Sequence, residues 1–463
     1  MARGKKAAQG LTPEEKLAQA LVPVEEQPYQ IPENWCWTYI KFLFDVTSSK
    51  RVHKEDWTNT GIPFYRTREL VKLSEQGYVD NELFITEDLY DKIIADYGKP
   101  TAGDVLISGV GTIGVPYVVE NSTPFYFKDG NVIWFQNRKK CNAKYIYYLY
   151  KSLFMYNQIH GMSSGTTVDT YTIVNANGTM LPLPPLTEQQ RIVDRIESIF
   201  AKVDEAKEKA QAVVDGFELR KSAILHKAFT GELTAKWREK HGVTLDSWEK
   251  ETSTKLFSYV TSGSRGWAQY YSDSGSVFIR MGNLDHGTVE LDMEDIQYVN
   301  LPSKAEGQRS KLQKNDILIS ITADIGMIGL VRNADQDMYI NQHIALARPT
   351  EENNAEFIAW YLVSDVGLKQ MQSKQRGATK IGLGLDDIRN LKLLMPQVNE
   401  QAEIVHILNG LLAKETAAKE AAESVLDQID TMKKAVLARA FRGELGTNDP
   451  TEASAVELLK SML

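Results

Sequence analysis

The chain has little of what membrane-bound and secreted proteins need. Its 463 residues include two cysteines, Cys36 and Cys141, and their positions match no metal-binding or redox spacing. Free thiols of this kind suit a reducing cytosol, so we expect a cytoplasmic protein. No run of eighteen apolar residues occurs, and the N-terminus MARGKKAAQG has no apolar segment. Neither membrane insertion nor secretion is therefore indicated.

The chain also lacks an excess of positive charge. Its formal net charge is −8, and residues 41–180 hold 15 basic and 15 acidic side chains. A uniformly basic nucleic-acid binder is excluded, so any DNA-binding surface must be local or completed by a partner.

Motifs of several enzyme classes are absent as well. There is no GxxxxGK[ST] nucleotide loop, no HExxH zinc motif and no Pro-Pro-aromatic motif for amino methylation. Residues Gly109 to Gly114 match GxGxxG, but no amphipathic helix follows. The second copy of this segment, described below, has Ile321 and Ala323 where the first two glycines would stand. A turn between strands is the better interpretation.

What the chain does contain is a long internal repeat. Residues 181–233 and 393–445 superpose with a constant shift of 212 and no gap, and roughly two in five paired positions are identical. Each copy reads as a helix of about forty residues, a rod of roughly 60 Å. Thr187 and Asn399 are the predicted N-caps, and Gly231 and Gly443 the predicted left-handed ends.

The apolar positions of both helices follow a 3.5-residue repeat, which predicts a coiled coil. The small pairs Ala206/Ala210 and Ala418/Ala422 would allow close approach, and Glu415 interrupts the second seam. The predicted seam residues are Ile192, Ile196, Ile199, Val203, Val213 and Phe217 in the first copy, and Ile404, Leu408, Leu411, Val425 and Ile429 in the second.

The two stretches that precede these helices also repeat. The first stretch has strand-like runs at 61–70, 103–119 and 131–136 and a helical run at 143–159. In the second stretch, 275–284 corresponds to the first strand, 314–331 to the second and 355–372 to the helix. These globular halves have diverged further than the helices. Residues 1–34 form an extension with a short helix after Thr12, and a partly ordered tail is the expected state. The fold class is therefore α/β, with two mixed heads related by pseudo-twofold symmetry and two long helices forming an antiparallel coiled coil.

The segments PLPPLTEQQRIV…KAFTGEL and LMPQVNEQAEIV…RAFRGEL resemble the conserved regions of the specificity subunit of type I restriction-modification systems. The resemblance covers roughly residues 30 to 445. It implies target-recognition domains at 35–183 and 234–395, spacer helices at 184–233 and 396–445, and a C-terminal tail at 446–463. Each head would read one half of a split, asymmetric DNA site.

The resemblance also implies a non-catalytic chain. Its partners would be double-stranded DNA, methyltransferase subunits (two of them) and restriction/translocase subunits. S-adenosylmethionine, ATP and Mg would be bound by those partners, and no cofactor or metal by this chain. Two alternatives from other classes stay open: a tandem-headed coiled-coil adaptor that binds proteins, and a nucleotide-dependent enzyme that uses the loop from Gly109 to Gly114.

Candidate DNA-binding residues come from three pairs of segments. Strand-end arginines can read guanine in two-point fashion but also form surface ion pairs, and glycine- and hydroxyl-rich loops suit phosphate contacts. The candidates are Lys50, Arg51, Arg66, Arg68, Ser163, Ser164, Gly165, Thr166 and Thr167 in the first half, and Ser264, Arg265, Arg280, Lys374, Arg376, Gly377, Thr379 and Lys380 in the second.

Overall fold

The computed structural model describes residues 12–120, 123–138, 141–163, 169–302, 307–375 and 382–463. The chain divides into two compact units. Unit 1 combines residues 1–209 with 425–463, and unit 2 comprises residues 210–424. Each unit therefore contains one head and part of both long helices.

Unit 1 is built around a four-stranded antiparallel sheet of order β2–β8–β5–β6. A three-stranded sheet, β4–β3–β7, and the antiparallel pair β1–β9 complete it. The strands are β1 Cys36–Tyr39, β2 Asp45–Thr47, β3 Ile62–Tyr65, β4 Phe84–Ile85, β5 Val105–Ser108, β6 Pro116–Val118, β7 Tyr126–Phe127, β8 Val132–Gln136 and β9 Met180–Leu183. The helices are α1 Pro13–Ala20, α2 Thr67–Gln76, α3 Glu87–Tyr97, α4 Ala143–Tyr150, α5 Leu153–Met162, α6 Ile173–Gly178 and α15 Ala455–Met462, with parts of α7 Leu186–Asp215 and α14 Val398–Ala440.

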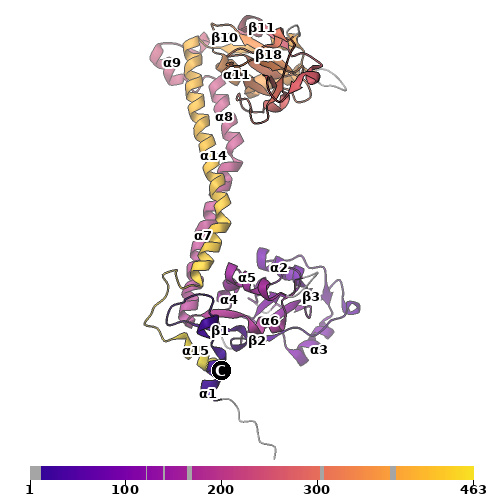
Figure 1. The fold of residues 1–463 in the computed structure, drawn as a ribbon, viewed down its shortest axis with the longest axis vertical. Coiled ribbons are helices and arrows are strands. Elements are labelled where there is room, and N and C mark those ends of the chain that lie inside the picture. The colour runs from indigo at the N-terminus through magenta and orange to yellow at the C-terminus, as the bar shows by residue number, and fades with distance from the viewer. Residues whose placement is uncertain (1–11, 121–122, 139–140, 164–168, 303–306, 376–381) are drawn as a thin grey trace, which may run out of the picture. The chain divides into compact units, whose positions relative to one another are not determined.

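Unit 2 repeats the four-stranded sheet as β11–β18–β15–β16 and the strand pair as β10–β19, and its second sheet, β12–β14–β13–β17, has one strand more than that of unit 1. Figure 1 labels β10, β11, β18 and α11 of this unit. Its strands are β10 Glu249–Thr252, β11 Phe257–Ser262, β12 Tyr271–Ser272, β13 Ser276–Ile279, β14 Gln297–Val299, β15 Ile317–Ser320, β16 Ile328–Leu330, β17 Met338–Ile340, β18 Ile344–Pro349 and β19 Lys392–Met395. Its own helices are α8 Phe217–Phe229, α9 Ala235–His241, α10 Ser253–Leu256, α11 Ala355–Val363, α12 Asp365–Ser373 and α13 Leu385–Arg389.

In the four-stranded sheets, the register of the central strands carries the same 212-residue shift as the helices. Val105 pairs with Val118 and Phe135 in unit 1, and Ile317 pairs with Leu330 and Ala347 in unit 2. Both heads also place one parallel pair in the second sheet, β3 with β7 and β13 with β17. The mixed α/β heads predicted from the sequence are thus confirmed, and their four-stranded sheets share one strand order.

Each unit holds an antiparallel helix pair. In unit 1, Asp204 of α7 bonds Lys433 of α14, and the Lys433 ammonium lies 5.2 Å from the Phe200 ring centre. In unit 2, Arg220 of α8 bonds Glu415 of α14 at 2.6 Å, and Lys419 lies 4.9 Å from the ring of Phe217. Glu415, expected as an interruption of the seam, therefore has a cationic partner.

The seam residues differ in burial. Ile192, Ile196, Ile404, Leu408 and Ile429 are buried; Ile199, Val203, Val213, Phe217 and Leu411 are partly buried; Val425 is 37% exposed. The prediction that both alanines of each small-residue pair lie in the seam is correct for one alanine of each pair. Ala210 and Ala422 are buried, whereas Ala206 and Ala418 are exposed, so one alanine of each pair lies in the seam.

Several local expectations were wrong. Helix α7 begins at Leu186 and α14 at Val398, so Thr187 and Asn399 lie inside the helices instead of capping them. The Thr187 hydroxyl donates to Glu452. The prediction of left-handed glycines at the helix ends is confirmed: Gly231 and Gly443 have φ of +83° and +74°.

The first long helix is also interrupted, because α7 ends at Asp215 and α8 begins at Phe217. Gly216 between them has the poorest helix propensity after proline. The Arg220 guanidinium donates to the carbonyl of Val213 at this break.

The heads show two further corrections. The strand expected at 61–70 ends at Tyr65, because α2 begins at Thr67. The Glu69 carboxylate accepts a hydrogen bond from the Arg66 backbone amide and so caps the start of α2. The helix expected at 143–159 is two helices, because the Ser152 side chain caps α5.

The N-terminal extension is not a loose tail from residue 12 onward. Thr12 and Glu15 form the capping box of α1, and Ala20 is fully buried. Ala20 shares one core with Leu459 of α15, which packs against α1. Helices α1 and α15 therefore complete the core of unit 1.

Candidate nucleic-acid interface

The strand-end arginines of the first head share one buried carboxylate. Glu69, 2% exposed, accepts from Arg66 Nε and Nη2 at 3.0 and 2.7 Å and from Arg68 Nε at 3.0 Å. Burial raises the pKa of Glu69, but the bonds from both arginines outweigh it and hold that pKa at about 2. Arg68 also pairs with the exposed Glu82 at 2.7 Å. The Glu69 carboxylate thus holds the guanidinium groups of Arg66 and Arg68 side by side.

The second head places Arg280 in the corresponding position. Its amide donates to Oδ1 of the buried Asn283, as the Arg66 amide does to Glu69. The Arg280 side chain pairs with Asp295 at 2.9 Å. All three strand-end arginines therefore form ion pairs, and the two heads surround the equivalent arginine with different partners.

The loop candidates near residues 50 and 265 are unequal. Lys50 and Arg51 are exposed; the Lys50 ammonium lies 4.9 Å from the Tyr97 ring centre, and Arg51 lies 3.7 Å from Asp129. Arg265 is exposed, but Ser264 is 4% exposed and lies within the core of its head. Cationic side chains in this pair of loops thus reach solvent.

The paired loops before the long helices lie largely outside the described residues. This applies to Ser164, Gly165, Thr166, Thr167, Arg376, Gly377, Thr379 and Lys380. Of their described neighbours, Ser163 donates to Asp169 at 3.1 Å, and Lys374 is half-buried at the end of α12.

The loop from Gly109 to Gly114 is a turn, as the sequence analysis favoured. It joins β5 to the antiparallel β6, and no helix follows it. Gly111 and Gly114 have φ of +80°, and Ala323, the counterpart of Gly111, has φ of +61°. Among the described residues no group of three acidic, histidine or cysteine side chains could hold a metal ion. No helix in the described part of the chain is long and apolar enough to span a bilayer.

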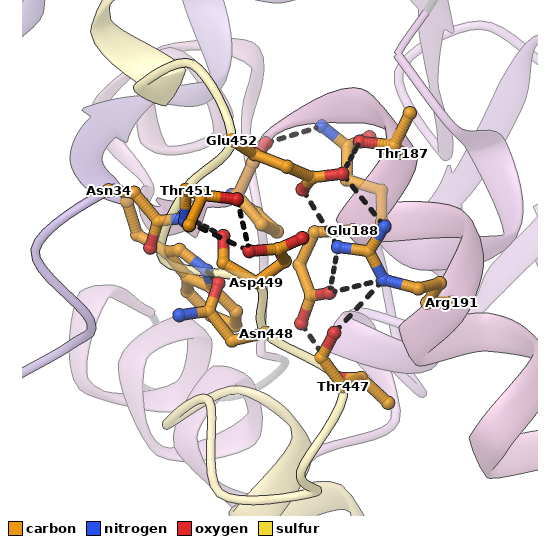
Figure 2. Close-up of polar contacts among 12 residues, drawn as sticks. Asn34, Thr187, Glu188, Arg191, Thr447, Asn448, Asp449, Thr451 and Glu452 are labelled. Carbon is orange, nitrogen blue, oxygen red and sulfur yellow. Dashed lines mark hydrogen bonds and ion pairs between the residues drawn. The ribbon is translucent and has the colours of Figure 1, made fainter.

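Sequence reasoning missed the role of the repeated Glu-Gln pair. Glu188 is fully buried and accepts from the Thr447 hydroxyl at 2.7 Å and from Arg191 at 2.8 Å. Figure 2 shows this cluster, in which Glu452 bonds Arg191 through both oxygens at 2.8 and 2.7 Å. Burial raises the pKa of Glu188, whereas the bond from Arg191 lowers that of Glu452 to about 2. The C-terminal tail is thereby fastened to the start of α7.

Unit 2 satisfies the equivalent glutamate from a different segment. Glu400, also fully buried, accepts from the Thr234 hydroxyl at 2.7 Å, from Arg238 at 2.6 Å and from the Trp248 indole at 3.0 Å. Residues 234–248 therefore bond the buried glutamate at the start of α14 in unit 2, as the C-terminal tail bonds the buried glutamate at the start of α7 in unit 1. Two repeated sequence features could have revealed these contacts. A Glu-Gln dipeptide stands at the start of both long helices, and a threonine, Thr234 or Thr447, stands just after each GEL ending.

A family model for the type I restriction modification DNA specificity domain matches residues 32–214 and 271–426. The chain belongs to that family. The match covers most of both heads and helices, so the expectation drawn from the repeated motifs is confirmed.

Curated relatives agree with this assignment. The EcoKI specificity subunit of Escherichia coli K12 is 25% identical over 434 residues, which is 90% of each chain. The EcoBI specificity subunit of Escherichia coli is 27% identical over 331 residues, 67% of this chain and 69% of that one. The HsdS subunit of Thermoanaerobacter tengcongensis has a similar fold, with a TM-score of 0.66 at 18% identity, over 91% of this chain and 100% of that chain. Specificity subunits recognise the DNA target of type I restriction-modification complexes, and this chain is one of them.

Proposed function

We propose that this chain reads a two-part, asymmetric DNA target, one half-site per head, with an unread spacer between them. The observation that carries the proposal is the repeat itself. The four-stranded sheets of both heads keep the same strand order, yet the heads surround equivalent arginines with different groups: Glu69 beside Arg66, and Asn283 with Asp295 beside Arg280. Equal scaffolds with unequal surfaces suit two different half-sites.

The arginines are the proposed base readers. Because Glu69 binds Arg66 through Nε and Nη2, the remaining Nη hydrogens can point outward in a fixed direction. A guanidinium held in this way can donate two hydrogen bonds to O6 and N7 of a guanine. Arg68 and Arg280 are the further candidates for base edges. The exposed Lys50, Arg51 and Arg265 would contact phosphates.

The proposed partners supply the chemistry. Two methyltransferase subunits would carry S-adenosylmethionine and methylate adenine, and restriction/translocase subunits would use ATP and Mg. The complex would act on DNA in the cytoplasm. With 15 basic and 15 acidic residues between 41 and 180, the first head alone should hold DNA weakly, and partner subunits would add the missing cationic surface.

Methylome sequencing tests the two-part target. Expressed with its partner subunits in a host without other adenine methylation, the chain should produce one split, asymmetric methylated motif. Substituting Arg66 with alanine should weaken methylation of that motif through one half only. A continuous motif, or the absence of sequence-selective DNA retention by the reconstituted complex, would refute the proposal; a protein-binding adaptor would give the second result.

The helices are the proposed spacer. Helix α14 has 43 residues, a rise of about 65 Å, which exceeds the 34–36 Å between half-sites one turn apart. Inserting four residues between Ala206 and Ala210, with a matching insertion between Ala418 and Ala422, should lengthen the spacer and leave both half-sites unchanged. An unchanged spacer would mean that these helices do not measure it.

A further inference from the structure

Each head is attached to its long helix at two points, and the attachment is the same in both units. The first point is the glutamine of the Glu-Gln pair. Gln189 of α7 is fully buried; its Oε1 accepts from the Asn142 amide at 3.0 Å, and its Nε2 donates to the Pro184 carbonyl at 3.0 Å. Asn142 is the N-cap of α4, so one side chain joins the chain entering α7, α7 itself and the head helix α4.

Unit 2 repeats these two hydrogen bonds. Gln401, 2% exposed, accepts from the Asn354 amide at 2.9 Å and donates to the Pro396 carbonyl at 2.8 Å. Asn354 is the N-cap of α11. All three residues are shifted by 212 from their counterparts in unit 1.

The second point lies two turns further along each long helix. Lys144 of α4 bonds Glu197 of α7 at 2.8 Å, and Asn409 of α14 donates to Glu356 of α11 at 2.9 Å. These positions also correspond with a shift of 212, although the residues differ and the head side chain changes from cation to anion. The same two positions are in contact despite different chemistry, which suggests that the contact matters for geometry.

The head helices are in turn packed on the four-stranded sheets β2–β8–β5–β6 and β11–β18–β15–β16. Helix α4 packs against β5 and β6, and α11 packs against β16. A helix that is held at two points along another helix cannot rotate about either point. The two contacts of each head with its long helix, which we call the joint, therefore fix the angle between the four-stranded sheet and that long helix.

We infer that Gln189 and Gln401 are positioning residues for DNA recognition. They fix the angle between each head and its spacer helix, so that only half-sites with one separation are bound together. One extra base pair displaces the second half-site by about 3.4 Å and turns it by about 34°, because B-DNA makes one turn in 10–10.5 base pairs over 34–36 Å. A head with a loose joint can follow that displacement, and a fixed head cannot. The inference rests on the proposed two-part target.

The test uses the full chain in complex with its partner subunits. Once the methylome has given the wild-type motif, a DNA library presents the same two half-sites with the native spacer and with one or two base pairs more or fewer. Adenine methylation of each member is counted by sequencing. Wild type should strongly favour one length.

Gln189→Met keeps the side-chain volume and removes the hydrogen bonds to the Asn142 backbone, the Pro184 carbonyl and the Cys141 thiol. Methylation at spacers one base pair off should rise about tenfold relative to the native spacer, equal to about 1.4 kcal/mol of lost discrimination, with unchanged half-site sequences. Gln401→Met should act in the same direction from the other head. Glu197→Gln, at a side chain 39% exposed and tolerant of substitution, should give a smaller broadening if Gln189→Met accumulates poorly.

Tyr126→Phe is the matched control. It removes a hydrogen bond of a buried tyrosine, from the Lys50 backbone N–H to the Tyr126 hydroxyl at 2.8 Å, within the same head but in β7, which is not part of the joint, and it should reduce methylation equally at every spacer. The inference is overturned if the glutamine variants also change methylation equally at every spacer, or if the control broadens the profile as much as they do. A wild-type complex with no split motif would instead refute the proposed function.

Discussion

The buried ion pair between Arg238 and Glu400 should be a main support of unit 2. Glu400 is fully buried, and Arg238 is its one cationic partner among the described contacts; Thr234 and Trp248 donate the other two hydrogen bonds. Arg238 also donates to the Gly231 carbonyl at 2.7 Å, just after the end of α8. Replacing Arg238 with methionine keeps most of the apolar stem and removes the charge and these donors.

The expected cost follows from the charge that is left behind. Removing one partner of a buried ion pair typically destabilises by about 3–5 kcal/mol. Since two neutral donors remain on Glu400, we expect about 3 kcal/mol for Arg238→Met. The matched variant is Arg191→Met in unit 1, where Arg191 is 37% exposed and Glu188 keeps the Thr447 bond. It should cost about 1–2 kcal/mol, since hydrogen bonds to charged groups are worth about 1.5–3 and solvent reaches this site.

Native-state amide hydrogen exchange measures the two units separately. In Arg238→Met, protection of β15 and β18 should fall about a hundredfold, the equivalent of about 3 kcal/mol, while β5 and β8 keep wild-type protection. The double variant Arg238→Met/Glu400→Gln should recover part of the loss, because no uncompensated charge remains. Equal loss in both units, or a change below about twofold in unit 2, would refute the reasoning that this pair stabilises its own unit.

Two further predictions concern the helix seam and the arginine cluster. Ala210→Leu should destabilise unit 2 by about 1–3 kcal/mol because Ala210 is buried, whereas the same change at the exposed Ala206 should stay within about 0.5 kcal/mol; urea unfolding distinguishes them, and equal effects would place the seam elsewhere. Glu69 has a folded pKa of about 2 against an ordinary 4.5, so its stabilisation is complete above pH 4.5 and is lost as pH falls through about 2. The stability difference between wild type and Glu69→Gln should therefore be constant above pH 4.5 and shrink below it, and a pH-independent difference would contradict the role of the ionised carboxylate.

The sequence by itself determined the features that are written locally or twice. The 212-residue shift predicted two heads of similar fold, and the 3.5-residue apolar repeat predicted the paired helices, in which Ile196 and Leu408 are each buried in the core of their own unit. Glycine at 231 and 443 predicted the helix ends because few other residues adopt positive φ. These signals depend on neighbours within a few turns, or on a comparison of one copy with the other.

Tertiary structure decided where side chains from distant segments meet. Thr187 looked like a helix cap, but the helix begins one residue earlier and Thr187 bonds Glu452 of the tail. No local pattern distinguishes these outcomes, because the competing partner lies 265 residues away. The same holds for the Gln189 contact with Asn142: its sequence signal is a repeated dipeptide, but its meaning appears only when the head folds back onto α7 and a buried amide must find an acceptor.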